Sequence, residues 1–406
     1  MKNTDPHWWT RPANRLPEGR YLRRLAYRLF ETGLALTVFT SLALAQPLNT
    51  VGNPKRASIN RGKMSYYPSD HWDLSSLPEY QPEQKVGGTI RIWGSNYFAD
   101  GSTAQYWQDG FRRFHPEVTF TYHLPNSLTA GGGLYAGVAD IGVGPRIPYN
   151  DISAFRTTFG YEPCEINVVT GSYNVEGWNP AFGIFVNKAN PLTRITMEQL
   201  DGIFGAQRAG GWINMDWHPE FARGPESNIR TWGQLGVKGE WADKPIRPRV
   251  LNLRSHWSVT ISDKLLRGSD QWNENVQMYP GSISLPDGKV VMGAQRMVED
   301  VGEDPYGITY STIEFLTPKT KVLEIAPRSG APYVALSLDT VRNRTYPLFD
   351  EVFMYINRAP GKPIDPKIRE FLRYILSRQG QQDVARDGKY LPLTKDVTIQ
   401  QLKKLD

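Results

Sequence analysis

The fold is decided first by the stretch GTIRIWG at residues 88–94, in which apolar and polar side chains alternate as in a half-buried β-strand. A helical pattern over 106–114, a strand over 118–122, a short helix after Gly131 and a strand over 139–143 follow in turn. Because strand and helix alternate, this region predicts a mainly parallel sheet flanked by helices, the α/β class.

The same alternation starts again at residue 183, so a second α/β unit is expected. Its signals are an apolar strand over 183–187 and a helix that Thr196 caps and that runs to Phe204. Further strands are predicted over 250–253, 307–310 and 352–357, and an amphipathic helix over 365–378.

Composition narrows the class of protein. A chain of 406 residues with 40% hydrophobic content suits two or three domains, or two lobes. Of the net charge of +6, residues 1–45 carry +4 (seven Lys or Arg against three acids), so only +2 belongs to the rest and a nucleic-acid partner is not expected. The single cysteine, Cys164, excludes an internal disulfide, and no Cys/His spacing predicts a metal site or cofactor.

The N-terminal segment predicts export. An apolar run at 33–45 follows a basic region and ends in Ala-Leu-Ala, which is typical of a cleaved signal peptide over 1–45 and of periplasmic localisation. A retained signal anchor is the alternative. Residues 46–86 are polar and without a period, and we interpret them as a linker or as an extension that wraps the folded part.

One segment has the chemistry of an anion site. Residues 254–260 read RSHWSVT and follow the strand at 250–253, so they begin a helix whose first amides lack partners within it. Arg254 adds a guanidinium that can hold an oxyanion with two parallel hydrogen bonds. The alternative interpretation makes Ser258 an N-cap and Arg254 a solvated charge.

Several separate stretches resemble the phosphate-binding periplasmic proteins that serve ABC importers, a family with the type II periplasmic-binding-protein fold. The resemblance covers residues 87–395. The order and spacing of these stretches along the chain are more specific than any single stretch. The stretches are 186–192, 195–200 with 203–204, 231–236, 304–310, 346–348 and 355–357.

The resemblance implies a hinged clamshell of two lobes, with lobe 1 over 87–181 and 308–406 and lobe 2 over 182–307. It implies that the protein is an exported, monomeric solute-binding protein that captures inorganic phosphate, or a similar tetrahedral oxyanion, for a membrane ABC permease. Carried over position by position, the ligand-binding residues are Ser95, Asn96, Ser127, Thr129, Arg146, Arg254, Ser258, Val259 and Thr260.

Two positions depart from the family pattern. Val259 stands where the family usually has glycine, so its side chain narrows the approach to the site. Pro145 stands where the family commonly has an acidic or Ser-Arg element, so a carboxylate that would reject fully ionised anions is missing there. Arg146 is then either a second donor to the anion or a surface charge.

Other functions were weighed against phosphate capture. Trp257 supports a receptor for another solute, organic or sugar-like. The altered loops leave room for an envelope protein that keeps the fold without binding phosphate. An exported hydrolase of phosphate esters needs a nucleophile or metal motif, and the sequence has none, so no enzymatic activity is expected.

Overall fold

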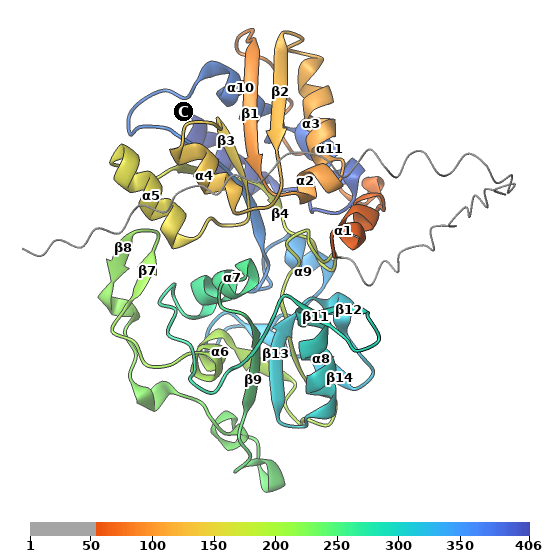
Figure 1. Ribbon diagram of the computed structural model, residues 1–406, viewed down its shortest axis with the longest axis vertical. Coiled ribbons are helices and arrows are strands. Elements are labelled where there is room, and N and C mark those ends of the chain that lie inside the picture. The colour runs from red at the N-terminus through yellow and green to blue at the C-terminus, as the bar shows by residue number, and fades with distance from the viewer. Residues whose placement is uncertain (1–53) are drawn as a thin grey trace, which may run out of the picture. The chain divides into compact units, whose positions relative to one another are not determined.

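The computed structural model describes residues 54–406 (Figure 1). The predicted signal peptide and its cleavage site lie outside these residues. Within 54–406, none of the helices combines the length and the apolar character needed to cross a membrane.

The first sheet has five strands and contains the stretch GTIRIWG at residues 88–94. The order is β2 (Val118–His123), β1 (Gly88–Gly94), β3 (Ile141–Gly144), β16 (Glu351–Ile356) and β4 (Cys164–Thr170). The first three strands are parallel, as predicted, while β16 runs antiparallel to both of its neighbours.

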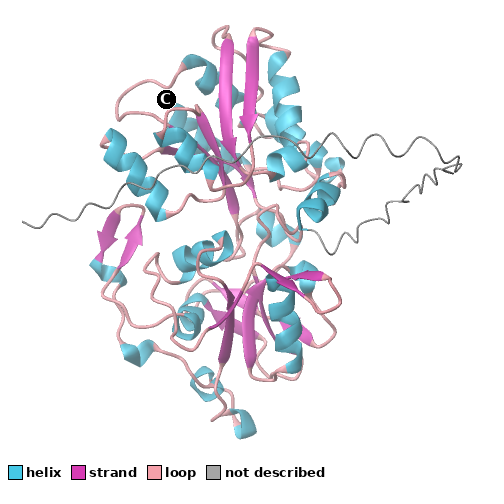
Figure 2. Cartoon of the chain, in the orientation of Figure 1, coloured by secondary structure: helices cyan, strands magenta, loops and turns pink. Residues whose placement is uncertain are grey.

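The second sheet repeats this plan. Its order is β10 (Gln277–Tyr279), β9 (Arg247–Leu251), β13 (Gly307–Ser311), β5 (Gly183–Asn187) and β14 (Thr320–Val322). Here β10, β9 and β13 are parallel and β5 is the antiparallel strand. Each sheet thus has four strands that run in one direction and one reversed strand in fourth place, with helices on its faces (Figure 2). The predicted α/β class with mainly parallel sheets is confirmed.

Helices connect and cover the strands. In lobe 1, α4 packs on β1 and β3, while α10 packs on β1 and on α3; in lobe 2, α8 packs on β13 and β5. The helices are α1 (Pro54–Gly62), α2 (Tyr97–Asp100), α3 (Thr103–Arg112), α4 (Thr129–Tyr135), α5 (Tyr149–Phe159), α6 (Met197–Phe204), α7 (His256–Leu265), α8 (Gly293–Glu303), α9 (Leu338–Arg342), α10 (Pro366–Ile375), α11 (Arg378–Asp387) and α12 (Lys395–Leu402).

Three short two-stranded ladders complete the strands. They are β6 (Arg194–Thr196) with β15 (Glu324–Ala326), β7 (Gly211–Ile213) with β8 (Asp216–His218), and β11 (Ser282–Ser284) with β12 (Val290–Met292).

Because β13, β14 and β15 pair with strands of lobe 2, the chain changes sheet only between Ala326 and Glu351. The expected lobe boundary at residue 307 is therefore too early.

Two crossing segments, 171–182 and 327–350, join the lobes and are bonded to each other. The Phe182 amide donates to the Leu348 carbonyl at 2.9 Å, and the Tyr346 hydroxyl donates to the Phe182 carbonyl at 2.9 Å. A side chain at Gly171 would lie 2.0 Å from the Asn179 carbonyl oxygen, so only glycine allows this close approach. A pair of adjacent crossings is the geometry of a hinge.

The N-terminal extension wraps lobe 1 rather than acting as a free linker. Its aromatic and aliphatic residues are buried in the main core, and the Tyr80 hydroxyl donates to the Glu370 carboxylate at 2.6 Å. These buried residues are Tyr67, Trp72, Leu74, Leu77 and Tyr80. Of the two interpretations of residues 46–86, the wrapping extension is the one that the described part, from residue 54, supports.

Candidate functional site

Two serine-bearing loops of lobe 1 meet at the end of β3. The Ser95 amide, just after β1, donates to the Val143 carbonyl at 2.8 Å. The Ser127 side chain lies against Gly144, since a methyl group at Gly144 would sit 3.4 Å from the Ser127 Cβ. Both loops therefore lie at the carboxyl edge of the parallel strands, where ligands bind in open α/β sheets.

The first loop offers the Ser95 hydroxyl but not the Asn96 side chain. Ser95 is buried, and its oxygen accepts a long hydrogen bond of 3.4 Å from the Tyr97 amide. The hydroxyl proton has no acceptor within residues 54–406. Asn96, in contrast, donates its side-chain amide to the Asp100 carboxylate at 2.8 Å, so this group is already engaged on α2.

The second loop likewise offers one hydroxyl of the two predicted. The Thr129 hydroxyl donates to the Asn126 carbonyl at 3.0 Å and so closes the turn before α4. The Ser127 hydroxyl has no hydrogen-bond partner in the described part of the chain. Because the N-cap position of α4 is Leu128 and no side chain caps this helix, the Ser127 hydroxyl is the group here that is free to donate to a ligand.

In lobe 2, the predicted helix start at 254–260 is confirmed, with Ser255 as its cap. The Ser255 side chain accepts the Ser258 amide at 3.2 Å, so the alternative that made Ser258 the N-cap is wrong. The amides of His256 and Trp257 occupy the first two positions of α7, where no intrahelical acceptor exists. The positive end of the helix dipole therefore carries two amides that can donate to an anion.

Ser258 and Val259 are engaged inside lobe 2. The Ser258 side chain is fully buried, donates to the Leu251 carbonyl at 3.0 Å and lies 2.8 Å from the Tyr310 hydroxyl. It also accepts from the Ser255 hydroxyl at 3.1 Å, so its one donor and both acceptor sites are used. The Val259 amide donates to the Ser255 carbonyl at 3.0 Å as part of α7.

Arg254 and Thr260 are not engaged in this way. The Arg254 side chain is exposed, and the described part of the chain gives it no hydrogen bond or ion pair. The Thr260 hydroxyl belongs to a buried residue and has no partner among the described atoms. A guanidinium with all its donors available is the group that best matches a dianionic oxyanion.

His256 adds no positive charge to this helix start at neutral pH. Loss of solvent around its half-buried ring lowers the pKa of His256 to about 4. Its imidazole is therefore neutral near pH 7, and the cation at the start of α7 is Arg254.

Arg146 differs from Arg254 because it is already paired. Its guanidinium donates to the side-chain oxygen of Asn214 and lies 3.6 Å from the Asp263 carboxylate on α7. Burial raises the pKa of Asp263, whereas the charge of Arg146 opposes that rise. Arg146 follows β3, so its contact with Asp263 brings the last turn of α7 next to the edge where Ser95 and Ser127 lie.

A separate cavity of about 500 Å³ lies next to Tyr97 but is unsuited to an anion. Its polar lining includes Arg61 and the carboxylates of Glu176, Glu299 and Glu314. Burial raises the pKa of Glu176 to about 7, even though Arg61 lies 3.0 Å away. Several carboxylates around one arginine would repel a dianion.

Two observations bear on the other functions, a receptor for an organic or sugar-like solute and a hydrolase of phosphate esters. Trp257 is buried and packs edge-on against Phe182 with 5.2 Å between ring centroids, so it is a core residue and no stacking platform. Within residues 54–406, no group of three or more His, Cys, Asp or Glu is arranged to hold a metal ion.

Sequence reasoning missed Ser255 and Tyr310, which hold the helix start in place. Ser255 had a local signal, since serine directly before a helix is a favoured cap. Tyr310 had none, because it reaches Ser258 from β13, 52 residues further along the chain.

Two α/β lobes, joined by two bonded crossings and each with the antiparallel strand in the same place, define a two-lobed binding protein. The PBP superfamily domain matches residues 80–379. The phosphate-binding protein PstS of Pseudomonas aeruginosa is 32% identical over 331 residues, which are 81% of this chain and 91% of that protein. The chain therefore belongs to the PBP superfamily and, within it, to the family of this PstS.

Other relatives are more distant. Protein SphX of Synechococcus elongatus is 26% identical over 214 residues, 52% of this chain and 53% of that protein. Among solved structures, an ABC-type phosphate transport receptor from Vibrio cholerae superposes with a TM-score of 0.46 and 18% identity, covering 74% of this chain and 99% of the receptor.

Proposed function

We propose that this chain captures inorganic phosphate between its two lobes and delivers it to a membrane ABC permease. The observation that carries the proposal is the contact of Arg146, which follows β3, with Asp263 in the last turn of α7. This contact supports a position of α7, whose start carries Arg254, beside the loops of Ser95 and Ser127. The relationship to a phosphate-binding PstS supports the choice of ligand.

The donors gathered there suit a tetrahedral dianion. They are the hydroxyls of Ser95, Ser127 and Thr260, the first amides of α7 and the guanidinium of Arg254. Neutral donors with one arginine satisfy many acceptor lone pairs without burying several cations that would repel one another in the empty site. The contacts of Ser258 suggest that it fixes the helix start, while Asn96 and Thr129 shape their loops.

The proposal includes the setting in which the protein works. We infer that it is exported to the periplasm with cleavage of residues 1–45, acts as a monomer, and is a receptor without catalytic activity. A receptor in that compartment needs no metal or cofactor to hold phosphate, because its own amides, hydroxyls and arginine supply the donors.

The proposed selectivity between anions follows from Pro145. With proline at this position, no carboxylate directly follows β3 to reject fully ionised anions. A site without an acceptor carboxylate admits sulfate and arsenate as well as phosphate. We therefore expect weaker discrimination against sulfate than a site with an acceptor carboxylate would give.

The test is isothermal titration of the phosphate-stripped, signal-free chain with phosphate, arsenate and sulfate at pH 6 and pH 8. We expect phosphate to bind with a dissociation constant of about 1 µM or tighter, which corresponds to about 8 kcal/mol. An absence of heat with all three anions would contradict the proposal and favour an envelope protein that has lost its ligand. Heat with an organic solute alone would favour a receptor of another class.

A further inference from the structure

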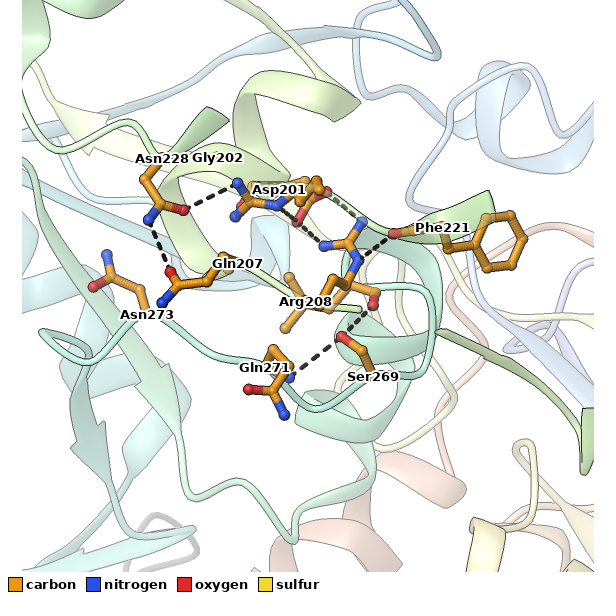
Figure 3. A network of polar contacts seen from close by, with 12 residues as sticks. Asp201, Gly202, Gln207, Arg208, Phe221, Asn228, Ser269, Gln271 and Asn273 are labelled. Carbon is orange, nitrogen blue, oxygen red and sulfur yellow. Dashed lines mark hydrogen bonds and ion pairs between the residues drawn. The ribbon is translucent and has the colours of Figure 1, made fainter. Parts of the chain in front are cut away.

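An arm of lobe 2, residues 206–223, leaves the lobe between α6 and β9 and carries the β7–β8 hairpin. Its root is held by Asp201 on α6, whose two carboxylate oxygens each accept from Arg208 at 2.7 Å (Figure 3). Arg223, at the other side of the root, lies 3.3 Å from the same carboxylate. All three side chains are largely buried, so the root is a fixed part of lobe 2.

Backbone contacts extend this attachment toward the hairpin. Arg208 and Arg223 exchange two backbone hydrogen bonds of 3.0 Å, and the Trp212 amide donates to the Arg267 carbonyl at 2.8 Å. The Arg208 guanidinium also donates to the Phe221 carbonyl at 2.9 Å (Figure 3). The arm therefore moves with lobe 2 as a stiff element.

The tip of the arm, in contrast, contacts lobe 1. Met215, at the turn between β7 and β8, packs against a small apolar cluster of lobe 1, and its amide donates to the Glu162 carboxylate at 3.2 Å. The buried members of this cluster are Ala130, Leu134, Ile147, Ile152, Phe155 and Tyr355. An apolar side chain with a fixed amide donor beside it is a docking contact rather than a loose surface encounter.

Residues on both sides of Met215 add contacts to the same face of lobe 1. Arg146 donates to Asn214, Arg156 lies 3.9 Å from the Asp216 carboxylate, and the rings of Tyr149 and Trp212 are 5.5 Å apart. Figure 1 shows the β7–β8 hairpin next to α5, which carries Tyr149 and Arg156.

We infer that the arm is a clasp: it holds the two lobes together when the anion is bound, and its release controls how fast the anion leaves. In this assignment Arg146 is a positioning residue that joins β3 to the arm and to α7 through Asn214 and Asp263. The inference rests on the proposed function, because closure around an anion is what the clasp would maintain.

The expected effect follows from where the arm acts. Its contacts are formed between lobes and touch none of the proposed anion donors, so they stabilise the closed state without adding ligand contacts. Loss of the clasp should therefore speed dissociation of phosphate and leave its association nearly unchanged.

The test variant is Met215→Ala combined with Glu162→Ala, in the signal-free chain. Stopped-flow measurements with inorganic phosphate should give a dissociation rate about tenfold faster than that of the unmodified chain, a factor that corresponds to a modest shift in the closed population. The matched control is Ile213→Ala, which truncates an exposed apolar side chain of the same hairpin and should leave the rate unchanged. Cooperative thermal unfolding of each variant, at a midpoint well above the temperature of the measurement, shows that all three proteins are folded.

The outcomes separate the clasp from the proposed function. An unchanged dissociation rate in the double variant overturns the clasp and leaves phosphate capture standing. If the unmodified chain binds no phosphate, the proposed function fails, and amide exchange at Met215 then tests the clasp. Slow exchange in the unmodified chain that becomes fast in Glu162→Ala supports docking of the arm, whereas fast exchange in both overturns it.

Discussion

The end of β3 and the start of α7 each present one arginine, and the two arginines differ in their surroundings. Arg146 is engaged with Asn214 and Asp263 of the other lobe, whereas Arg254 is exposed and has no partner within residues 54–406. A guanidinium that is already paired has fewer donors left for a ligand. A positive charge near the proposed site is therefore not equivalent to a charge that is available to an anion.

The largest expected effect comes from the arginine without partners. Arg254→Ala should weaken phosphate binding by about 3 kcal/mol, roughly 100-fold, because a charged pair that is shielded from solvent loses one member. The thermal midpoint of the empty protein should stay nearly the same, since Arg254 makes no hydrogen bond or ion pair within residues 54–406. Arg328→Ala, at an exposed arginine of the loop after β15, is the control for the loss of one charge. A large fall in the midpoint of Arg254→Ala would mean that Arg254 is structural.

A second test compares two hydroxyls of α7, those of Ser258 and Thr260. Ser258→Ala should lower the free energy of unfolding by about 2 kcal/mol, because the buried Tyr310 hydroxyl loses the acceptor of its proton and the Leu251 carbonyl loses the hydroxyl that donates to it. Thr260→Val should leave stability nearly unchanged and weaken phosphate binding, since the Thr260 hydroxyl has no partner in the described protein. Urea unfolding and titration on both variants measure the two effects. The reverse pattern would mean that Ser258 is the hydroxyl that contacts the anion.

The sequence alone predicts where α7 begins, but it does not predict which role each residue at this helix start has. A strand followed by Arg-Ser-His-Trp-Ser predicts the start of α7 from local signals alone. Which serine turns inward depends on Tyr310, a residue on a different strand that no local pattern connects to Ser258.

Contacts between residues far apart in the chain also explain which parts of the fold the sequence does not predict. The period-two strands β1 and β2 were predicted because each carries its own alternation, and β5 because it is a continuous apolar run. The lobe boundary was placed too early because β13 pairs with β5, more than 120 residues before it, and this pairing leaves no local mark. The sequence predicts no element in the arm, because the ion pairs of Asp201 with Arg208 and Arg223 give it its shape.

An intermediate effect is expected for the paired arginine. Arg146→Ala should weaken phosphate binding about tenfold, or about 1.4 kcal/mol, mainly through faster dissociation. Arg146→Lys keeps the charge but loses the planar fork that reaches both Asn214 and Asp263, so it should restore only part of the affinity. If Arg146→Ala matched Arg254→Ala in size and acted on association, Arg146 would be a ligand-binding residue.

The smallest expected effect is a change with pH in the free energy of unfolding. It tests whether His256 is neutral, so that Arg254 supplies the positive charge at the start of α7. His256 has a folded-state pKa of about 4, below its ordinary value of 6.5, so the folded protein resists protonation of this ring. The stability that a neutral His256 supplies is present above pH 6.5 and is lost as the pH falls from 6.5 toward 4. Between pH 7.0 and 5.5 the loss should be about 1 kcal/mol. Urea unfolding of the unmodified chain and of His256→Gln at both pH values measures it as the difference between the two proteins. An equal pH dependence in both would mean that His256 titrates normally, and the helix start would then gain a second positive charge in mild acid.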